Sequence, residues 1–522
     1  MSESVPAAAP RPQGAIEGAG KGGAALPAWW PLAALTILAA ALRLSTLHLQ
    51  SFWYDEAFTP VHVLHPSLWA TLRSFVHTEN TPPMWYVIAW ADSRVLGSGE
   101  IALRLPSALA GIATVPVAWA IGRELTGRRA TAIAAAAFVA VNPLFVWYSQ
   151  EARAYALFVL TAALAMLCFL RALRRPSSGR MAAFALSGSL ALLSHYFAVF
   201  LLIGMVVWLV WEKSRRRAAL PAVGVLALVG VALLPLISAQ GGHGTQWIGE
   251  WALSSRLQAI PQYYLTDYYG AALGHGIELL VALPILAGIG YGLWRVLSAP
   301  EERGALIALT LAAGGMLLPI ALVALGADYL APRNLVATMI PVTALIAVVV
   351  PSERAGTMGI ALAVTIAVAF AAISIDVNLS PRLQRGDWRG LARVLRGGGP
   401  GGTLLPAPAA GERVITTVEL GAAPLEYYIP GLHNLARGMS VSVNEVDETG
   451  YFPLRASADS PPAPGFHLLT RTDVNGLISY RFVSAIPRMI SEATLRRHVI
   501  TLAHPEVLVG AGARVSPSGE NI

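Results

Sequence analysis

Two adjacent carboxylates, Asp55 and Glu56, are the residues of this chain best placed to do chemistry. They lie in the segment Ser51-Phe-Trp-Tyr-Asp-Glu-Ala57, directly after the first long hydrophobic stretch at residues 29–47. Charged side chains are costly to desolvate at the edge of a bilayer, and acids kept there tend to mark a working site. We therefore expect this pair in the reaction centre. The alternative is an acidic turn beneath an interfacial belt of aromatic residues.

Glu151 is a second carboxylate that we expect on the same side of the membrane. In a helical turn, three- and four-residue spacing would place it on one face with Tyr148 and Tyr155. It could bind a divalent cation or the acceptor together with Asp55, or it could neutralise Arg153. No spacing of histidines and carboxylates in the sequence demands a metal, so the metal ligands stay unknown and no cofactor is certain.

Two arginines, Arg153 and Arg333, interrupt a charge bias that the rest of the chain keeps. A guanidinium at the end of a helix can hold a phosphate with two parallel hydrogen bonds, more specifically than a lysine can. These two arginines are therefore candidates for binding a phosphate. The alternatives are an arginine that snorkels to lipid head groups, or one that pairs with Glu151 or Asp328.

Other polar and aromatic residues gather on the same predicted side. Arg104 and His195 are further candidates for phosphate contacts, although a histidine beside aromatic residues is commonly a structural donor. Trp247 and a tyrosine-rich cluster favour an interfacial belt over a platform on which a sugar stacks. That cluster comprises Tyr263, Tyr264, Asp267, Tyr268 and Tyr269.

The composition indicates the elements that must position these residues. Hydrophobic residues make up 55% of the 522 and charged residues 13%, well below the roughly 25% of charged residues in soluble domains. The sequence predicts a polytopic α-helical membrane protein with about eleven transmembrane helices. The apolar stretches lie near residues 29–47, 101–122, 130–147, 154–173, 181–193, 198–211, 218–238, 276–294, 305–325, 335–350 and 356–373.

Arginine placement predicts the orientation, because short cytoplasmic loops are enriched in Lys and Arg. With the N-terminus in the cytoplasm, the inside loops collect most arginines, whereas the short outside loops hold Arg153, Arg256 and Arg333. This orientation requires residues 81–90 to form a juxtamembrane helix on the outer surface and not a full span. We expect a multi-pass protein of the inner (plasma) membrane, with its active site outside the cytoplasm.

Three parts follow along the chain. The first is rich in Ala, Gly and Pro, which is typical of a disordered tail. The last loses the hydrophobicity of the middle part, and it contains one helical pattern, at 387–395, and two strand patterns, at 413–418 and 466–471. We expect a disordered cytoplasmic tail at 1–28, a transmembrane catalytic domain at 29–375 with its first outer loop at 48–100, and a small extracytoplasmic α/β domain at 376–522.

Charge and cysteine content exclude several classes. The net charge of +7 comes mainly from arginines of the inside loops, so it reports topology and predicts no nucleic-acid partner. The single cysteine, Cys168, excludes an internal disulfide and a thiolate-rich metal site.

Eight short motifs occur in order along most of the chain. They are Trp53-Tyr-Asp-Glu-Ala57, Asn80-Thr-Pro-Pro-Met-Trp-Tyr86, Arg104-Leu-Pro-Ser-Ala108, Asn142-Pro143, Tyr148-Ser-Gln-Glu-Ala-Arg153, Ser194-His-Tyr196, Tyr329-Leu-Ala-Pro-Arg333 and Asp387-Trp-Arg389. Together they resemble the GT-C membrane glycosyltransferases, and within them the protein-mannosyltransferase-like family 39 group that includes the aminoarabinose transferases of lipid A. Asn80 departs from the histidine of many relatives, which puts an acid or base role at that position in doubt.

The resemblance implies an inverting transfer of a sugar from a polyprenyl-phosphate donor to a hydroxyl of a protein, lipid or glycan. It makes Asp55 the catalytic carboxylate, Glu56 its neighbour, Glu151 the second acidic position, and Arg153 and Arg333 contacts of the donor phosphate. The residue chemistry agrees. Inversion needs one carboxylate to accept the proton of the attacking hydroxyl, and cations stabilise the departing phosphate.

Three alternative functions compete with this one. A transporter or lipid flippase tends to show repeats, broken helices and charges near mid-membrane, whereas here the polar residues collect at the outer ends of the helices. A ligase of the O-antigen type would be expected to carry a large late outer loop with Arg and His, but residues 240–275 hold only Arg256, His243 and His275. A receptor or structural protein leaves the clustered acids and arginines without a role.

Overall fold

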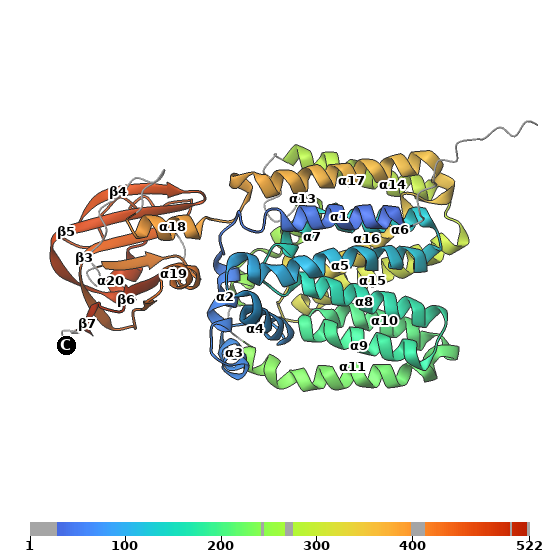
Figure 1. Cartoon of the computed structure of the whole chain (residues 1–522), viewed down its shortest axis with the longest axis horizontal. Coiled ribbons are helices and arrows are strands. Elements are labelled where there is room, and N and C mark those ends of the chain that lie inside the picture. Colours follow the sequence, from blue (N-terminus) through green and yellow to red (C-terminus); the bar gives the residue numbers. More distant parts are fainter. Residues whose placement is uncertain (1–28, 242–244, 267–274, 398–412, 502–503, 519–522) are drawn as a thin grey trace, which may run out of the picture.

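The computed structural model of the protein describes residues 29–241, 245–266, 275–397, 413–501 and 504–518. A bundle of helices is followed by a smaller part built on a β-sheet, which lies beyond one end of the bundle (Figure 1). The predicted tail at 1–28, the positions 267–269 of the tyrosine-rich cluster, and His243 lie outside the described residues.

All eleven apolar stretches are helical within the described residues. In the part of the chain that the structure describes, six helices are long and apolar enough to cross a membrane, or seven if the bent pair α6 and α7 counts as one span. The count of eleven spans therefore stays a prediction. The helices are α1 (Trp30–Leu44), α5 (Glu100–Thr126), α6 (Arg129–Val141), α7 (Pro143–Ser149), α8 (Tyr155–Arg174), α9 (Ser178–Ser194), α10 (Ala198–Trp211), α11 (Lys213–Gln240), α14 (His275–Trp294), α15 (Ala299–Ala324), η2 (Pro332–Thr338) with α16 (Met339–Val349), and α17 (Gly356–Leu379).

The break between α6 and α7 is a consequence of Pro143. Proline has no N–H to donate to the carbonyl of Val139, so the helix bends by 53° at this point. Asn142 caps the new helix by accepting a hydrogen bond from the N–H of Phe145 at 3.4 Å. Carbonyls in the apolar interior need other donors. Two residues supply them here, Arg43 and Ser374.

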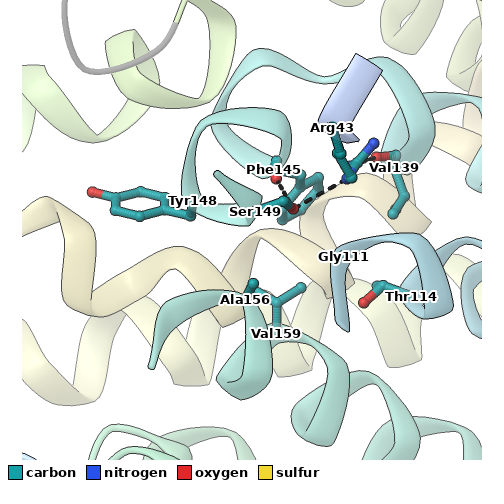
Figure 2. Close-up of a pocket in the computed structure, with 9 residues that line it drawn as sticks. All are labelled: Arg43, Gly111, Thr114, Val139, Phe145, Tyr148, Ser149, Ala156 and Val159. Atoms are coloured by element: carbon teal, nitrogen blue, oxygen red, sulfur yellow. Dashed lines mark hydrogen bonds between the residues drawn. The ribbon is translucent and has the colours of Figure 1, made fainter. Parts of the chain in front are cut away.

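Arg43 is fully buried and ties α1 to this break. Its guanidinium donates to the carbonyl oxygens of Val139 and Ala140 at 2.9 and 2.7 Å, and its Nε donates to Ser149 Oγ at 3.1 Å. Ser374 Oγ of α17 donates to the carbonyl of Val141 at 2.7 Å. Figure 2 shows Arg43 directed toward Ser149 beside a small cavity of about 10 Å³. The buried charge therefore has a structural role, and the break is not an open ion site.

Short helices cover the end of the bundle that faces the sheet (Figure 1). The predicted helix at 81–90 corresponds to α4, whose 13 residues are too few to cross a bilayer. The shorter elements there and elsewhere are α2 (Tyr54–Val63), α3 (Leu68–Ser74), η1 (Phe75–His77), α4 (Met84–Leu96), α12 (Gln246–Glu250), α13 (Leu253–Thr266), η3 (Glu353–Ala355) and η4 (Pro381–Leu383).

The C-terminal part is a seven-stranded mixed sheet with three short helices. The strand order is β2-β6-β1-β3-β5-β4, with β7 also beside β3; β1 and β3 run parallel and the other pairs antiparallel. The predicted helix and both predicted strands are confirmed as α18, β1 and β4. The elements are α18 (Trp388–Leu395), β1 (Arg413–Thr417), α19 (Ala422–Tyr428), β2 (Leu432–Asn434), β3 (Met439–Gly450), β4 (His467–Val474), β5 (Leu477–Ser491), α20 (Glu492–Arg497), β6 (Glu506–Gly510) and β7 (Arg514–Pro517).

A buried cluster joins the sheet to the loop that carries the acidic pair. Trp53 packs with Trp388, Leu391 and Ile415 in one hydrophobic cluster. The N–H of Trp388 donates to Ser51 Oγ at 3.0 Å, and the N–H of Phe52 donates to the hydroxyl of Tyr428 at 2.7 Å. The sheet part therefore holds the segment around Asp55 in place.

Candidate active site

Asp55 and Glu56 occupy the first turn of α2, where the helix dipole favours carboxylates. Because they are consecutive, their side chains point to different surroundings. Asp55 lies in the wall of a large cavity and forms an ion pair with Arg333 of η2. The Arg333 guanidinium also lies over the ring of Trp247, 4.9 Å from its centroid. The predicted acid and the predicted phosphate contact thus lie together.

Glu56 faces away from the large cavity and is fully buried. Both of its oxygens accept from Arg104, at 2.7 and 2.6 Å, and one also accepts from the N–H of Ala152 at 2.8 Å. Burial by itself would raise the pKa of Glu56, but the charges of Arg104 and Arg385 outweigh it and hold the pKa below its usual value. Glu56 is therefore a stable anion that anchors the turn.

The guanidinium of Arg104 uses all of its hydrogen-bond donors in this arrangement. Besides Glu56, its guanidinium donates to the carbonyl oxygens of Leu47, Gln50 and Ser51 at 2.7–2.9 Å. It is 1% exposed and does not line the large cavity. The structure thus places this predicted phosphate contact where it stabilises the loop before Asp55.

Glu151 is also fully buried, and its partner is Arg385, a residue that the sequence analysis missed. Its Oε2 accepts from Arg385 Nη2 at 3.1 Å, while its Oε1 has no hydrogen-bond partner among the described residues. Burial raises the pKa of Glu151 to about 7 against the opposing charge of Arg385, and the charges of Glu56 and Asp55 raise it further. The expected helical turn is wrong, because α7 ends at Ser149 and α8 begins at Tyr155.

Arg385 is enclosed between two indole rings and two carboxylates. Its guanidinium carbon is 4.0 Å from the ring centroid of Trp147 and 5.3 Å from that of Trp53, and its Nη1 is 3.8 Å from Glu56. The segment between α17 and α18 therefore delivers a cation directly behind the acidic pair. No local pattern marked Arg385, although it lies two residues before the motif that begins at Asp387.

Arg153 pairs with Glu79 and not with Glu151, which corrects one of the alternatives. The pair is two-pronged, with N to O distances of 2.8 and 2.9 Å, and the hydroxyl of Tyr86 accepts a further bond at 3.3 Å. Burial would raise the pKa of Glu79, but Arg153 outweighs it and lowers the pKa. Both residues line the large cavity.

His195 lines the same cavity as a neutral ring. Its Nδ1 accepts from the N–H of Phe197 at 3.2 Å, and its ring stacks on Phe158 with the centroids 4.7 Å apart. Burial lowers the pKa of His195 to about 3, and the charges of Arg333 and Arg153 lower it further. The residue can offer an Nε2–H donor but no positive charge.

The large cavity has a volume of about 1110 Å³ and two chemically different ends. It brings together Asp55, Arg153, His195 and Arg333 of the predicted site residues, whereas Glu56, Arg104 and Glu151 lie behind its wall. The polar end also carries Glu79, Asn80, Trp247 and Tyr263. The apolar end is lined from α10, α11 and α15 by residues that include Val199, Phe200, Ala227, Val231, Leu234, Ile237, Pro319 and Leu322.

No three His, Cys, Asp or Glu side chains in the described part of the chain are grouped so as to hold a metal ion. Asp55 and Glu151, the two acids considered for a divalent cation, face Arg333 and Arg385.

This chain is similar to one protein family by sequence and to several solved structures by fold. Residues 80–239 match the family described as dolichyl-phosphate-mannose-protein mannosyltransferase, whereas no curated protein matches the chain. The structure of ArnT from Cupriavidus metallidurans bound to undecaprenyl phosphate is similar over 87% of this chain and 98% of that one, with 14% identity and a TM-score of 0.51. The partial family match and the shared fold both agree with the resemblance to GT-C, protein-mannosyltransferase-like proteins that the motifs suggested.

Two larger proteins show lower similarity. The archaeal oligosaccharyltransferase AglB from Archaeoglobus fulgidus has 14% identity over 73% of this chain, with a TM-score of 0.45, and the chain spans about 60% of its length. Arabinosyltransferase EmbB from Mycobacterium smegmatis has 15% identity over 77% of this chain and 37% of its own, with a TM-score of 0.36.

Proposed function

We propose that this protein is an inverting glycosyltransferase that moves a sugar from a polyprenyl-phosphate donor to a hydroxyl acceptor at the outer face of the membrane. The observation that carries the proposal is the two-ended cavity. A polyprenyl chain is apolar along its length and ends in a charged phosphate, and the cavity offers an apolar end followed by Arg333 and Arg153. The match to ArnT, whose structure holds undecaprenyl phosphate, supports the same assignment.

In this reaction Asp55 is the catalytic base. The acceptor hydroxyl attacks the anomeric carbon, the bond from that carbon to the phosphate oxygen breaks, and the hydroxyl proton passes to the Asp55 carboxylate. The polyprenyl phosphate leaves as an anion, and Arg333 is placed to stabilise the developing charge. Because Arg333 pairs with Asp55, a phosphate that binds Arg333 would also free the carboxylate for its role as a base.

The buried residues behind the cavity have a supporting part. Glu56 and Arg104 hold the first turn of α2, and Arg385 and Glu151 pack directly behind it. We therefore assign Glu56, Arg104 and Glu151 to positioning the site and not to contact with the donor. Arg153 already has a two-pronged partner in Glu79, so Arg333 is the stronger candidate for the donor phosphate.

The orientation rests on the arginines. The connections from α5 to α6 and from α8 to α9 lie at the end of the bundle opposite the sheet (Figure 1). Arg128 precedes α6, and Arg171 and Arg174 lie in the last turn of α8. Short cytoplasmic loops are enriched in such residues, so we assign that end to the cytoplasm. The cavity and the C-terminal sheet then lie on the outer side of the plasma membrane.

The test is complementation of a gene deletion with Asp55→Asn. Mass spectrometry of envelope glycans and glycoproteins should reveal a sugar that is lost on deletion, restored by the wild type and absent with the variant. Asp473→Asn, an exposed carboxylate on β4 outside the cavity, is the matched control and should restore the sugar. Restoration by Asp55→Asn at wild-type protein levels would remove Asp55 from the base role.

A further inference from the structure

The C-terminal sheet part forms one wall of the large cavity. Glu419 and Leu420 reach it from the turn between β1 and α19, Tyr451 from the loop after β3, and His504 from the segment before β6. Glu419 and His504 are exposed, and Tyr451 is 42% exposed, so all three offer free surface to a ligand. The wall faces the same space as Asp55 and Arg333.

The turn that carries Glu419 has an unusual backbone conformation and close packing. Leu420 has a φ of +64°, a conformation that residues other than glycine rarely adopt. It is held there because the N–H of Ala422 donates to Glu506 at 2.7 Å. The next residue, Gly421, has no room for a side chain, since a Cβ would approach the Trp388 ring to 2.9 Å. Strained, tightly supported turns are common at ligand sites.

The same turn is fixed relative to the catalytic helix. Trp388 donates its N–H to Ser51, four residues before Asp55, and α19 packs against α2. The hydroxyl of Tyr428, at the end of α19, accepts from the N–H of Phe52. These contacts connect the part of the sheet domain that carries Glu419 to the segment just before Asp55.

The charge of this wall limits what can bind. The two arginines of the cavity are each paired with a carboxylate, Arg153 with Glu79 and Arg333 with Asp55. Glu419 makes no ion pair with any described residue, and it lies close enough to Tyr451 that its charge, after burial, raises the pKa of that hydroxyl. A negative group brought to this wall is repelled by the charge of Glu419. An exposed tyrosine ring near a carboxylate, with an imidazole lining the same cavity, suits the face and hydroxyls of a sugar.

We propose that Glu419, Tyr451 and His504 form the acceptor subsite, and that it takes a sugar residue without negative charge. The proposal rests on the glycosyltransferase function above and narrows its acceptor to a neutral or cationic glycan. Anionic acceptors, including phosphorylated glycolipids, would be disfavoured by Glu419.

Ligand-observed NMR on the purified full-length protein tests this directly, with three probes: methyl α-mannopyranoside, glucosamine and glucose 6-phosphate. The wild type should bind the first two and reject the third by tenfold or more in Kd. Tyr451→Ala should weaken methyl α-mannopyranoside at least tenfold, and Glu419→Lys should abolish the discrimination against glucose 6-phosphate. Asp473→Asn should change none of the three. Equal binding of the neutral and phosphorylated sugars by the wild type, or unchanged Kd values in both wall variants, would overturn the proposal.

A separate titration with undecaprenyl phosphate, followed by tryptophan fluorescence, distinguishes failure of this inference from failure of the proposed function. Tyr451→Ala should bind that lipid as the wild type does, because it leaves Arg333 and the apolar lining from α10, α11 and α15 unchanged. Sugar discrimination without any lipid binding would leave the subsite standing and count against the donor assignment. Lipid binding without sugar discrimination would count against the acceptor subsite and leave the donor assignment standing.

Discussion

Arg385 offers the sharpest test of how the site is held, because its removal leaves a buried carboxylate without a partner. In Arg385→Gln, Glu56 keeps Arg104 and the N–H of Ala152, so the loss falls on Glu151. Breaking a buried ion pair by removing one member costs about 3–5 kcal/mol. We expect a loss of this size at pH 8, where Glu151 of the wild type is ionised.

The destabilisation caused by Arg385→Gln should be larger at pH 8 than at pH 5.5. The pKa of Glu151 is raised from 4.5 to about 7, so the folded protein holds a proton that the unfolded chain releases. Stability from this group is therefore present below pH 4.5 and is lost as the pH rises from about 4.5 to 7. At pH 5.5 the carboxyl of Glu151 is neutral, and Arg385→Gln should lose mainly the contacts with Trp147 and Trp53, about 1–2 kcal/mol.

Thermal unfolding in detergent measures this difference through Cys168, the only cysteine, which a thiol-reactive dye labels as the helices separate. Glu151→Gln combined with Arg385→Gln should recover much of the loss at pH 8, because no buried charge remains. Arg389→Gln is the matched control: its pair with Glu100 is 38% exposed on the arginine side, and such pairs contribute at most about 1 kcal/mol. Equal destabilisation at both pH values, with no recovery in the double variant, would refute the reasoning.

Three other perturbations test separate parts of the structure. Arg333→Lys keeps the charge but loses the two-pronged geometry, so the Kd for undecaprenyl phosphate should rise about tenfold; an unchanged Kd by fluorescence titration would contradict the phosphate role. His195→Gln should raise the unfolding temperature at pH 5 and leave it unchanged at pH 8. The pKa of His195 is lowered from 6.5 to about 3 in the folded protein, so the wild type loses stability as the pH falls from about 6.5 to 3. A decrease in the unfolding temperature confined to pH 5 would count against a neutral ring. Gly111→Ala should destabilise the fold by about 1–3 kcal/mol, since its Cβ would lie 2.0 Å from Ser149 Oγ, whereas Gly224→Ala, where nothing lies within 4 Å, should not; equal unfolding temperatures would show that the bundle can yield there.

Local physics determined the helices and the acidic pair from the sequence. Apolar runs of about twenty residues must satisfy their backbone groups internally, so each predicted stretch is helical in the structure. Asp55 was identified because an acid next to aromatic residues at the end of such a run is unusual whatever the fold around it. The two strands of the C-terminal part also followed from local patterns, whereas the short α4 followed from the distribution of arginines among the loops.

The partners of the charged residues were decided only by the tertiary structure. Coulomb attraction carries no information on sequence distance, so neither the pairing of Glu151 with Arg385, 234 residues away, nor that of Arg333 with Asp55, 278 residues away, could be read from spacing. For the same reason Arg104 and Arg153 were assigned to a phosphate when the fold supplies each with a carboxylate. The sequence by itself determined which residue types reach the site, and packing determined which of them face the cavity and which lie behind it.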